Sequence, residues 1–188
     1  DAYHAQGGPL NVAPLSSPHR FARLFVDAAV QAGHAPNPDF NGATQEGVGL
    51  YEVTHKGGER WSAARAYLRP ALGRPNLEVV TGAHATRILF EGKRAVGVAF
   101  TQNGVQRVAK ARGEVILAGG AINSPQLLQL SGVGPAELLI RNGVAVVADL
   151  PGVGENLQDH YVMSVRYRLK PGVVSVNEQS KGGRLAGE

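Results

Sequence analysis

The chain contains no cysteine among its 188 residues, and this absence excludes several kinds of chemistry. Without thiols there are no disulfides, no thiolate metal ligands and no cysteine nucleophile. A cysteine-free chain is compatible with a reducing compartment. We therefore expect a cytoplasmic location, with membrane association of a longer protein left open.

Long apolar runs are also missing. No stretch approaches the roughly 20 apolar residues that a bilayer-spanning helix requires. The start, Asp1-Ala2-Tyr3-His4, has neither the basic segment nor the apolar core of a signal peptide. With 43% hydrophobic and 18% charged residues, the composition is typical of a globular protein. We expect one domain, or parts of two.

Positive charge is present but not clustered. The formal net charge is +4, and a nucleic-acid partner would need Lys and Arg gathered on one surface to neutralise phosphates. Most arginines fall singly with acids nearby, and Lys110-Ala111-Arg112 approaches a run. We therefore expect no nucleic-acid partner.

Helical patterns occur in both halves of the chain. Apolar residues at three- and four-residue spacing predict an amphipathic helix that Ser17 caps, that Pro18 opens and that ends at Gly33. A second helix is predicted over residues 61–72. Ser124 and Pro125 are expected to cap and open a third helix, and Pro135 a fourth.

Strand patterns dominate between and after these helices. Strands are predicted at residues 77–81, 88–90, 95–101, 105–109, 144–150 and 162–169. Those at 88–90, 95–101 and 105–109 would form an antiparallel meander, with one turn at Asn103-Gly104. The apolar run 115–118, ended by Gly119-Gly120, is typical of a strand buried on both faces of a parallel sheet.

Short catalytic and metal-binding motifs are absent. Gly132-Val133-Gly134 comes closest to the dinucleotide fingerprint Gly-x-Gly-x-x-Gly, but Glu137 takes the place of the third glycine, and a helix-ending turn explains it better. The sequence has neither Gly-x-Ser-x-Gly nor Ser-x-x-Lys. Its six histidines form no His-x-x-x-His pair, so we expect no metal site.

The pair Asp159-His160 allows two interpretations. An aspartate beside a histidine could orient an imidazole as a base. Adjacent side chains in an extended segment, however, point to opposite faces and would not normally meet. This favours the second interpretation, in which Asn156 and Asp159 stabilise a turn through hydrogen bonds to the backbone.

A longer motif is more specific. Residues 120–134, Gly-Ala-Ile-Asn-Ser-Pro-Gln-Leu-Leu-Gln-Leu-Ser-Gly-Val-Gly, closely resemble the second signature of the glucose-methanol-choline (GMC) oxidoreductases. Residues 39–42, 60–64, 66–68, 76–98 and 152–160 are also similar to that family. The resemblance spans essentially the whole chain and is nearest to choline-dehydrogenase-like and alcohol-dehydrogenase members.

This resemblance implies a mixed α/β fold. The chain would contain a fragment of an FAD-binding, Rossmann-like domain with an antiparallel meander, and part of a substrate domain built on an antiparallel sheet. Residues 76–149 would belong to the FAD-binding domain. Residues 1–75, with some connecting chain, and residues 150–188 would belong to the substrate domain.

The resemblance also implies cofactor contacts. Ala85 matches a position whose backbone N–H and C=O hold the adenine of FAD. Ala118, Gly119 and Gly120 match a turn that lies against the cofactor, where small residues permit close approach. Ser124 would support that turn by packing, with direct flavin contact left open. Asn156 and His160 resemble positions at the join between the domains, without an assigned role.

The implied reaction is oxidation of an alcohol, in which the hydroxyl proton is removed and a hydride passes from the carbon to N5 of the flavin. The family's ADP-binding fingerprint and its catalytic histidine have no counterpart here. We therefore predict an internal fragment with no catalytic residue, inactive without the missing N- and C-terminal parts of the same enzyme. A small alcohol would be the substrate.

Two other functions stay open, a folded module without cofactor and a nicotinamide-dependent enzyme. The alcohol is also open. Recognition of choline would need aromatic faces and a carboxylate around its ammonium group. Tyr51, Glu52, Trp61 and Tyr67 are candidates, but core and surface positions would explain them equally well.

Overall fold

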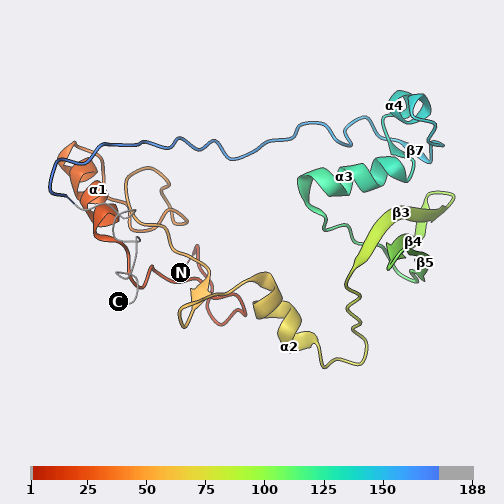
Figure 1. Ribbon diagram of the computed structural model, residues 1–188, viewed down its shortest axis with the longest axis horizontal. Helices are drawn as coiled ribbons and strands as arrows, with labels where there is room; N and C mark the ends of the chain where they lie inside the picture. The colour runs from red at the N-terminus through yellow and green to blue at the C-terminus, as the bar shows by residue number, and fades with distance from the viewer. Residues whose placement is uncertain (1, 174–188) are drawn as a thin grey trace. The chain divides into compact units, whose positions relative to one another are not determined.

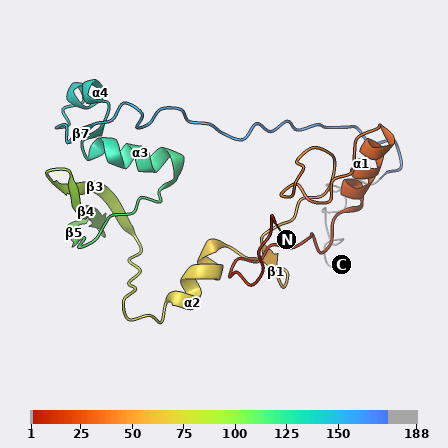
Figure 2. The same cartoon turned by 180° about the vertical axis from the view of Figure 1, so that it is seen from behind.

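The computed structural model describes residues 2–173, and its backbone forms two compact units (Figures 1 and 2). Within these residues, the first unit ends at Thr81 and the second begins at Gly82. The assignment of residues 1–75, 76–149 and 150–188 to parts of a substrate domain and an FAD-binding domain stays a prediction.

The first unit begins with a loop and helix α1, Arg20–Gln31. The predicted amphipathic helix is present, but it starts later than its sequence indicates. His19 is the N-cap, and its Nδ1 accepts a hydrogen bond from the N–H of Phe21 at 3.3 Å. Because the imidazole supplies the acceptor, Ser17 is not used as the cap.

The rest of the first unit consists of short elements in irregular chain. They are β1 (His55–Lys56), β2 (Glu59–Arg60), the π-helical turn η1 (Ala64–Leu68) and α2 (Arg69–Ala71). Strands β1 and β2 form an antiparallel hairpin. The helix predicted over residues 61–72 is therefore present from residue 64 to residue 71, with a π-helical first part.

An antiparallel meander forms the larger sheet of the second unit. Its strands are β3 (Ala83–Glu91), β4 (Arg94–Gln102) and β5 (Val105–Lys110), in the order β3-β4-β5. Asn103 and Gly104 have φ of 51° and 76°, the conformation of the two-residue turns that suit strand twist. The predicted meander is confirmed. Strand β3 begins earlier than predicted because its first residues pair with the end of β4.

A helix-rich segment follows the meander. Its elements are α3 (Gly120–Leu130), β6 (Val133–Gly134), α4 (Ala136–Arg141) and β7 (Ala148–Asp149). Strands β6 and β7 are parallel, and α4 lies between them in the chain. The predicted turn at residues 132–134 is correct only for Gly132, which ends α3, because Val133 and Gly134 form β6.

The core of the second unit is small. Its buried side chains belong to Ile88, Ser131, Val133 and Leu139, where α3 contacts β3 and β6 and where α4 contacts β6. One polar residue, Ser131, therefore lies among three apolar ones.

Several predicted strands are not formed. Residues 77–81, 115–118 and 162–169 have no strand partner within residues 2–173, and only Ala148–Asp149 of 144–150 is a strand. Ile116, predicted to be buried, is 78% exposed. A strand covered on both faces of a parallel sheet needs a neighbour on each side, and the described residues provide neither for 115–118.

The predicted mixed α/β fold is confirmed, since helices accompany an antiparallel meander and a small parallel pair. Within residues 2–173, no helix combines the length and the apolar character that crossing a membrane requires.

Gly132 supplies a test of the close packing between the end of α3 and the chain that leads to β7. Its φ is +91°, and an added Cβ would lie 2.4 Å from the carbonyl oxygen of Ala145. Gly132→Ala is expected to lower the free energy of unfolding by about 3 kcal/mol, through backbone strain and overpacking. Urea titration followed by circular dichroism measures this loss.

The matched control is Gly143→Ala. Gly143 also has a positive φ, +70°, but no atom lies within 4 Å of an added Cβ. Strain alone should cost about 1 to 2 kcal/mol. Equal losses in the two variants would contradict the role of close packing at Gly132.

Candidate cofactor site

Strand β3 is an edge strand of the meander, so alternate backbone groups along it point away from β4. Ala85 is an exposed residue of this strand and pairs with Phe100. A register shift between Ala85 and Arg87 leaves Thr86 as an extra residue, as in a β-bulge. Thr86 Oγ1 donates a hydrogen bond to the C=O of Ala99 at 3.1 Å. Ala85 thus lies beside a bulge, where an edge strand changes the direction of its backbone.

The predicted cofactor turn, residues 118–120, leads directly into α3, and all three residues are exposed. Gly120 has φ of +81°, in the region that side chains disfavour, and an added Cβ would meet no atom within 4 Å. The backbone conformation therefore requires glycine, and open space lies beside it.

Ser124 lies close to this turn but does not cap the helix as predicted. Helix α3 begins at Gly120, and Gly119 is the N-cap. The Oγ of Ser124 accepts a hydrogen bond from the N–H of Gly119 at 3.0 Å. Pro125 lies inside the helix, where it offers no N–H to the carbonyl of Ala121. The positive φ of Gly120 lets the helix start four residues before the Ser-Pro pair.

Ser131 connects α3 to β3. It is 2% exposed, and its Oγ accepts a hydrogen bond from the N–H of Ile88 at 2.8 Å and donates one to the C=O of Leu127 at 2.5 Å. Sequence reasoning missed this residue. Nothing near Ser131 indicates a partner 43 residues earlier in the chain.

Gln129 connects the same helix to the chain that follows β7. Its Nε2 donates a hydrogen bond to the C=O of Val153 at 2.9 Å. Asn156, three residues further on, has φ of +57°, a turn conformation that asparagine tolerates. The turn of this segment, however, lies at residues 151–154, so the turn at Asn156 that the sequence predicts is not formed.

The pair Asp159-His160 differs from its prediction. The two side chains do meet, with His160 Nδ1 3.7 Å from Asp159 Oδ1. The same Oδ1 accepts the N–H of His160 at 2.7 Å, so the expected side-chain to backbone bond is formed locally. The residues are outside any strand, so the alternation of faces does not apply. Both side chains are more than 95% exposed, and nothing orients the imidazole as a base.

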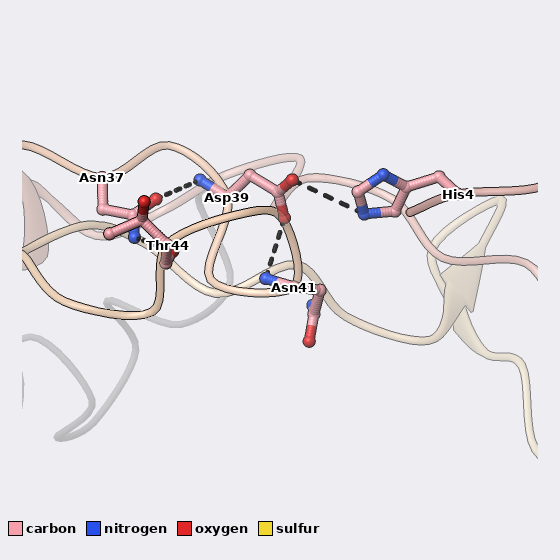
Figure 3. A network of polar contacts seen from close by, with 5 residues as sticks. All are labelled: His4, Asn37, Asp39, Asn41 and Thr44. Atoms are coloured by element: carbon pink, nitrogen blue, oxygen red, sulfur yellow. Dashed lines mark hydrogen bonds and ion pairs between the residues drawn. The ribbon is translucent and has the colours of Figure 1, made fainter. Parts of the chain in front are cut away.

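The first unit contains a separate polar network around Asn37, which is 8% exposed (Figure 3). Its Nδ2 donates hydrogen bonds to the C=O of Thr44 at 2.7 Å and of Glu46 at 3.0 Å. Its Oδ1 accepts the N–H of Asp39 at 2.8 Å. One amide therefore holds both ends of the loop 37–46.

Asp39 extends this network toward the N-terminus. Its Oδ1 accepts the N–H of Asn41 at 2.9 Å, and its Oδ2 lies 3.5 Å from Nε2 of His4 (Figure 3). Residues 39–42, which carry part of the family resemblance, therefore shape a loop.

Trp61 has structural contacts that explain it without a ligand. Its Nε1 donates a hydrogen bond to the C=O of Pro9 at 2.8 Å. Lys56 Nζ and Arg65 Cζ lie 5.1 and 5.5 Å from its ring centroids. Because the ring already contacts two cations, it gives no support to a choline site, and Tyr51 packs instead on Phe40 at 5.1 Å.

The chain is similar in sequence to proteins of one known family. A family model described as GMC oxidoreductase matches residues 1–162. The alcohol dehydrogenase [acceptor] of Pseudomonas putida is 52% identical over 160 residues, covering 84% of this chain and 29% of that protein. Mitochondrial choline dehydrogenase of Homo sapiens is 51% identical over 158 residues, covering 84% and 27%. The chain thus spans less than a third of the length of the curated relatives it matches.

Solved structures share the backbone arrangement. An FAD-dependent oxidoreductase from Chaetomium thermophilum has a TM-score of 0.75 at 29% identity, over 80% of this chain and 27% of that one. Pyridoxine 4-oxidase from Mesorbium loti has a TM-score of 0.73 at 31% identity, over 79% and 29%.

The Asn37 network predicts a local loss of stability on mutation. Asn37→Ala removes three part-buried hydrogen bonds, which join the Asn37 amide to the N–H of Asp39 and to the carbonyls of Thr44 and Glu46. Cleavage within residues 38–46 by a protease should accelerate about tenfold or more, because the loop opens more often. Asn41→Ala is the control, since only its main-chain N–H takes part. Equal cleavage rates in the two variants would refute the role of Asn37.

Proposed function

The chain belongs to the GMC oxidoreductase family, and on that premise we propose that it is part of an FAD-dependent enzyme that oxidises the CH–OH group of an alcohol. Relatives named alcohol dehydrogenase and choline dehydrogenase support this reaction class. Since the chain spans less than a third of their length, activity would require the other parts of the same enzyme.

The observation that carries the proposal is the exposed main chain on two contacting elements, α3 and β3. Ala85 lies on the open edge of β3, where backbone N–H and C=O groups are available to a ligand. Gly120 opens α3 with free space beside its Cα. These features fit a group that binds through the main chain and needs close approach.

Ala85 would hold the adenine of FAD, and residues 118–120 would lie against the cofactor. Ser124 would act indirectly, because its hydroxyl holds the N–H of Gly119 and so stabilises the turn. When bound, FAD would supply the hydride acceptor. The residues of this chain would position it.

Removal of the hydroxyl proton is assigned to a histidine outside residues 2–173, as the family resemblance implies. His160 is exposed and bonded only to its neighbour. We propose choline or another primary alcohol as the substrate, because relatives of both names are similar to the chain. The cytoplasmic location and the lack of a nucleic-acid partner stay predictions.

Flavin absorbance separates the proposed function from the alternatives. Retention of the flavin bands in the purified 188-residue protein, or binding of added FAD, would support a cofactor role. Failure of both this protein and the full-length enzyme to bind FAD would leave a module without cofactor. Binding of NADH in place of FAD would indicate a nicotinamide-dependent enzyme.

Gly120→Ala tests the cofactor turn directly. A side chain at φ of +81° strains the turn, and its Cβ would occupy the open space proposed for FAD. In the full-length enzyme, the Kd for FAD should rise about tenfold or more, as measured by quenching of flavin fluorescence.

Gly113→Ala is the matched control, because Gly113 has no positive φ and an added Cβ would meet no atom within 4 Å. Its Kd should stay within about twofold of the wild type, as expected for a surface change. A Gly120→Ala enzyme that binds FAD as the wild type does would refute the placement of FAD at this turn.

A further inference from the structure

Ser131 is the one polar residue buried in the described part of the second unit. A buried hydroxyl is costly unless both its proton and its oxygen are used. Here the proton goes to the C=O of Leu127, which leaves the oxygen lone pairs to the N–H of Ile88. The hydroxyl is therefore fully used and its orientation is determined.

The N–H of Ile88 has no alternative partner in the meander. It points away from β4, because β3 is an edge strand and Ser131 lies on its open side. Ile88 is 4% exposed, so water does not readily replace the hydroxyl. Loss of the hydroxyl would leave a buried N–H unpaired.

The hydrogen bond between Ser131 and Ile88 lies some distance from both candidate cofactor residues, Gly120 and Ala85. Helix α3 contacts strand β3, and along its own element each of Gly120 and Ala85 lies on the N-terminal side of the bond. Gly120 is about 16 Å from Ser131 along the helix. Ala85 is about 10 Å from Ile88 along the strand.

Because Gly120 is far from the bond, a small change in the tilt of α3 at Ser131 becomes a large displacement of Gly120. A tilt of α3 by about 10° would displace Gly120 by about 3 Å. Binding sites need their groups held within about 0.5 Å of the productive geometry. The contact between Ser131 and Ile88 can therefore determine the relative placement of the main chain at Gly120 and at Ala85.

We propose that Ser131 is a positioning residue for FAD, whose hydroxyl orients α3 on β3 so that the main chain at Gly120 and at Ala85 can bind the same cofactor molecule. Ser131 itself does not touch the cofactor. The inference rests on the proposed function.

The test compares two Ser→Ala variants of the full-length enzyme. Ser131→Ala removes the buried hydroxyl, whereas Ser62→Ala removes an exposed one that accepts the N–H of Arg65 in the first unit. The Kd for FAD should rise about tenfold in Ser131→Ala, the change that about 1.4 kcal/mol produces. It should stay within about twofold in Ser62→Ala.

Hydrogen exchange of the apoprotein adds a readout other than activity. The Ile88 amide should be protected in the wild type although it lies on the open edge of β3, and it should exchange faster in Ser131→Ala. A purely structural Ser131 would lower the melting temperature of the apoprotein without changing the Kd for FAD of the folded variant.

Several outcomes would overturn the inference. One is a folded Ser131→Ala enzyme with the wild-type Kd, and another is rapid exchange of the Ile88 amide in the wild type. If Ser131→Ala does not fold, Ser131→Cys keeps the size with a much weaker acceptor, and unchanged FAD binding would have the same meaning. A wild-type enzyme that binds no FAD would overturn the proposed function as well. A wild-type enzyme that binds FAD, with an unchanged Kd in Ser131→Ala, would overturn only the inference about Ser131.

Discussion

The hydroxyl of Ser131 accepts the N–H of Ile88 and donates to the C=O of Leu127, and these two bonds join helix α3 to strand β3. An edge strand presents backbone groups that its own sheet cannot pair. The helix supplies the missing acceptor at one such group, and Val133 and Leu139 complete a small apolar core nearby. Because few apolar side chains are buried, this directional polar contact contributes more to the orientation of α3 than non-directional apolar packing would.

The same constraint explains why the apolar run at 115–118 is not a strand. Its pattern indicates a strand covered on both faces, but backbone groups form a strand only where neighbours pair with them. The described residues give the run no neighbour, and Ile116 remains exposed. The meander has the opposite property. Its three strands are consecutive and joined by tight turns, so all their pairing lies within one short segment.

The parts that sequence predicted well are those determined by local signals. Asn103-Gly104 requires positive φ at both residues and therefore indicates the hairpin directly. Ser124-Pro125 is also a local signal, but the helix start predicted from it is wrong. Helix α3 begins earlier, at Gly120, whose positive φ permits that start. Ser131 could not be found in this way, since its partner is 43 residues away and its type is unremarkable at a helix end. The candidate cofactor residues came from family resemblance, as alanine and glycine carry no chemical signal of their own.

In a site built from main chain and small residues, the side chains that determine the geometry lie behind the backbone and do not face the ligand. At the proposed site, Ala85 and Gly120 would contribute backbone groups, so these positions need only the absence of a large side chain. The side chains that hold this backbone, Thr86, Ser124 and Ser131, bond to the main chain and leave the ligand's space open. Under the proposed function, this segment would contribute the position of the cofactor to the redox reaction. Under the proposed function, the histidine that removes the substrate's proton would lie in another part of the enzyme.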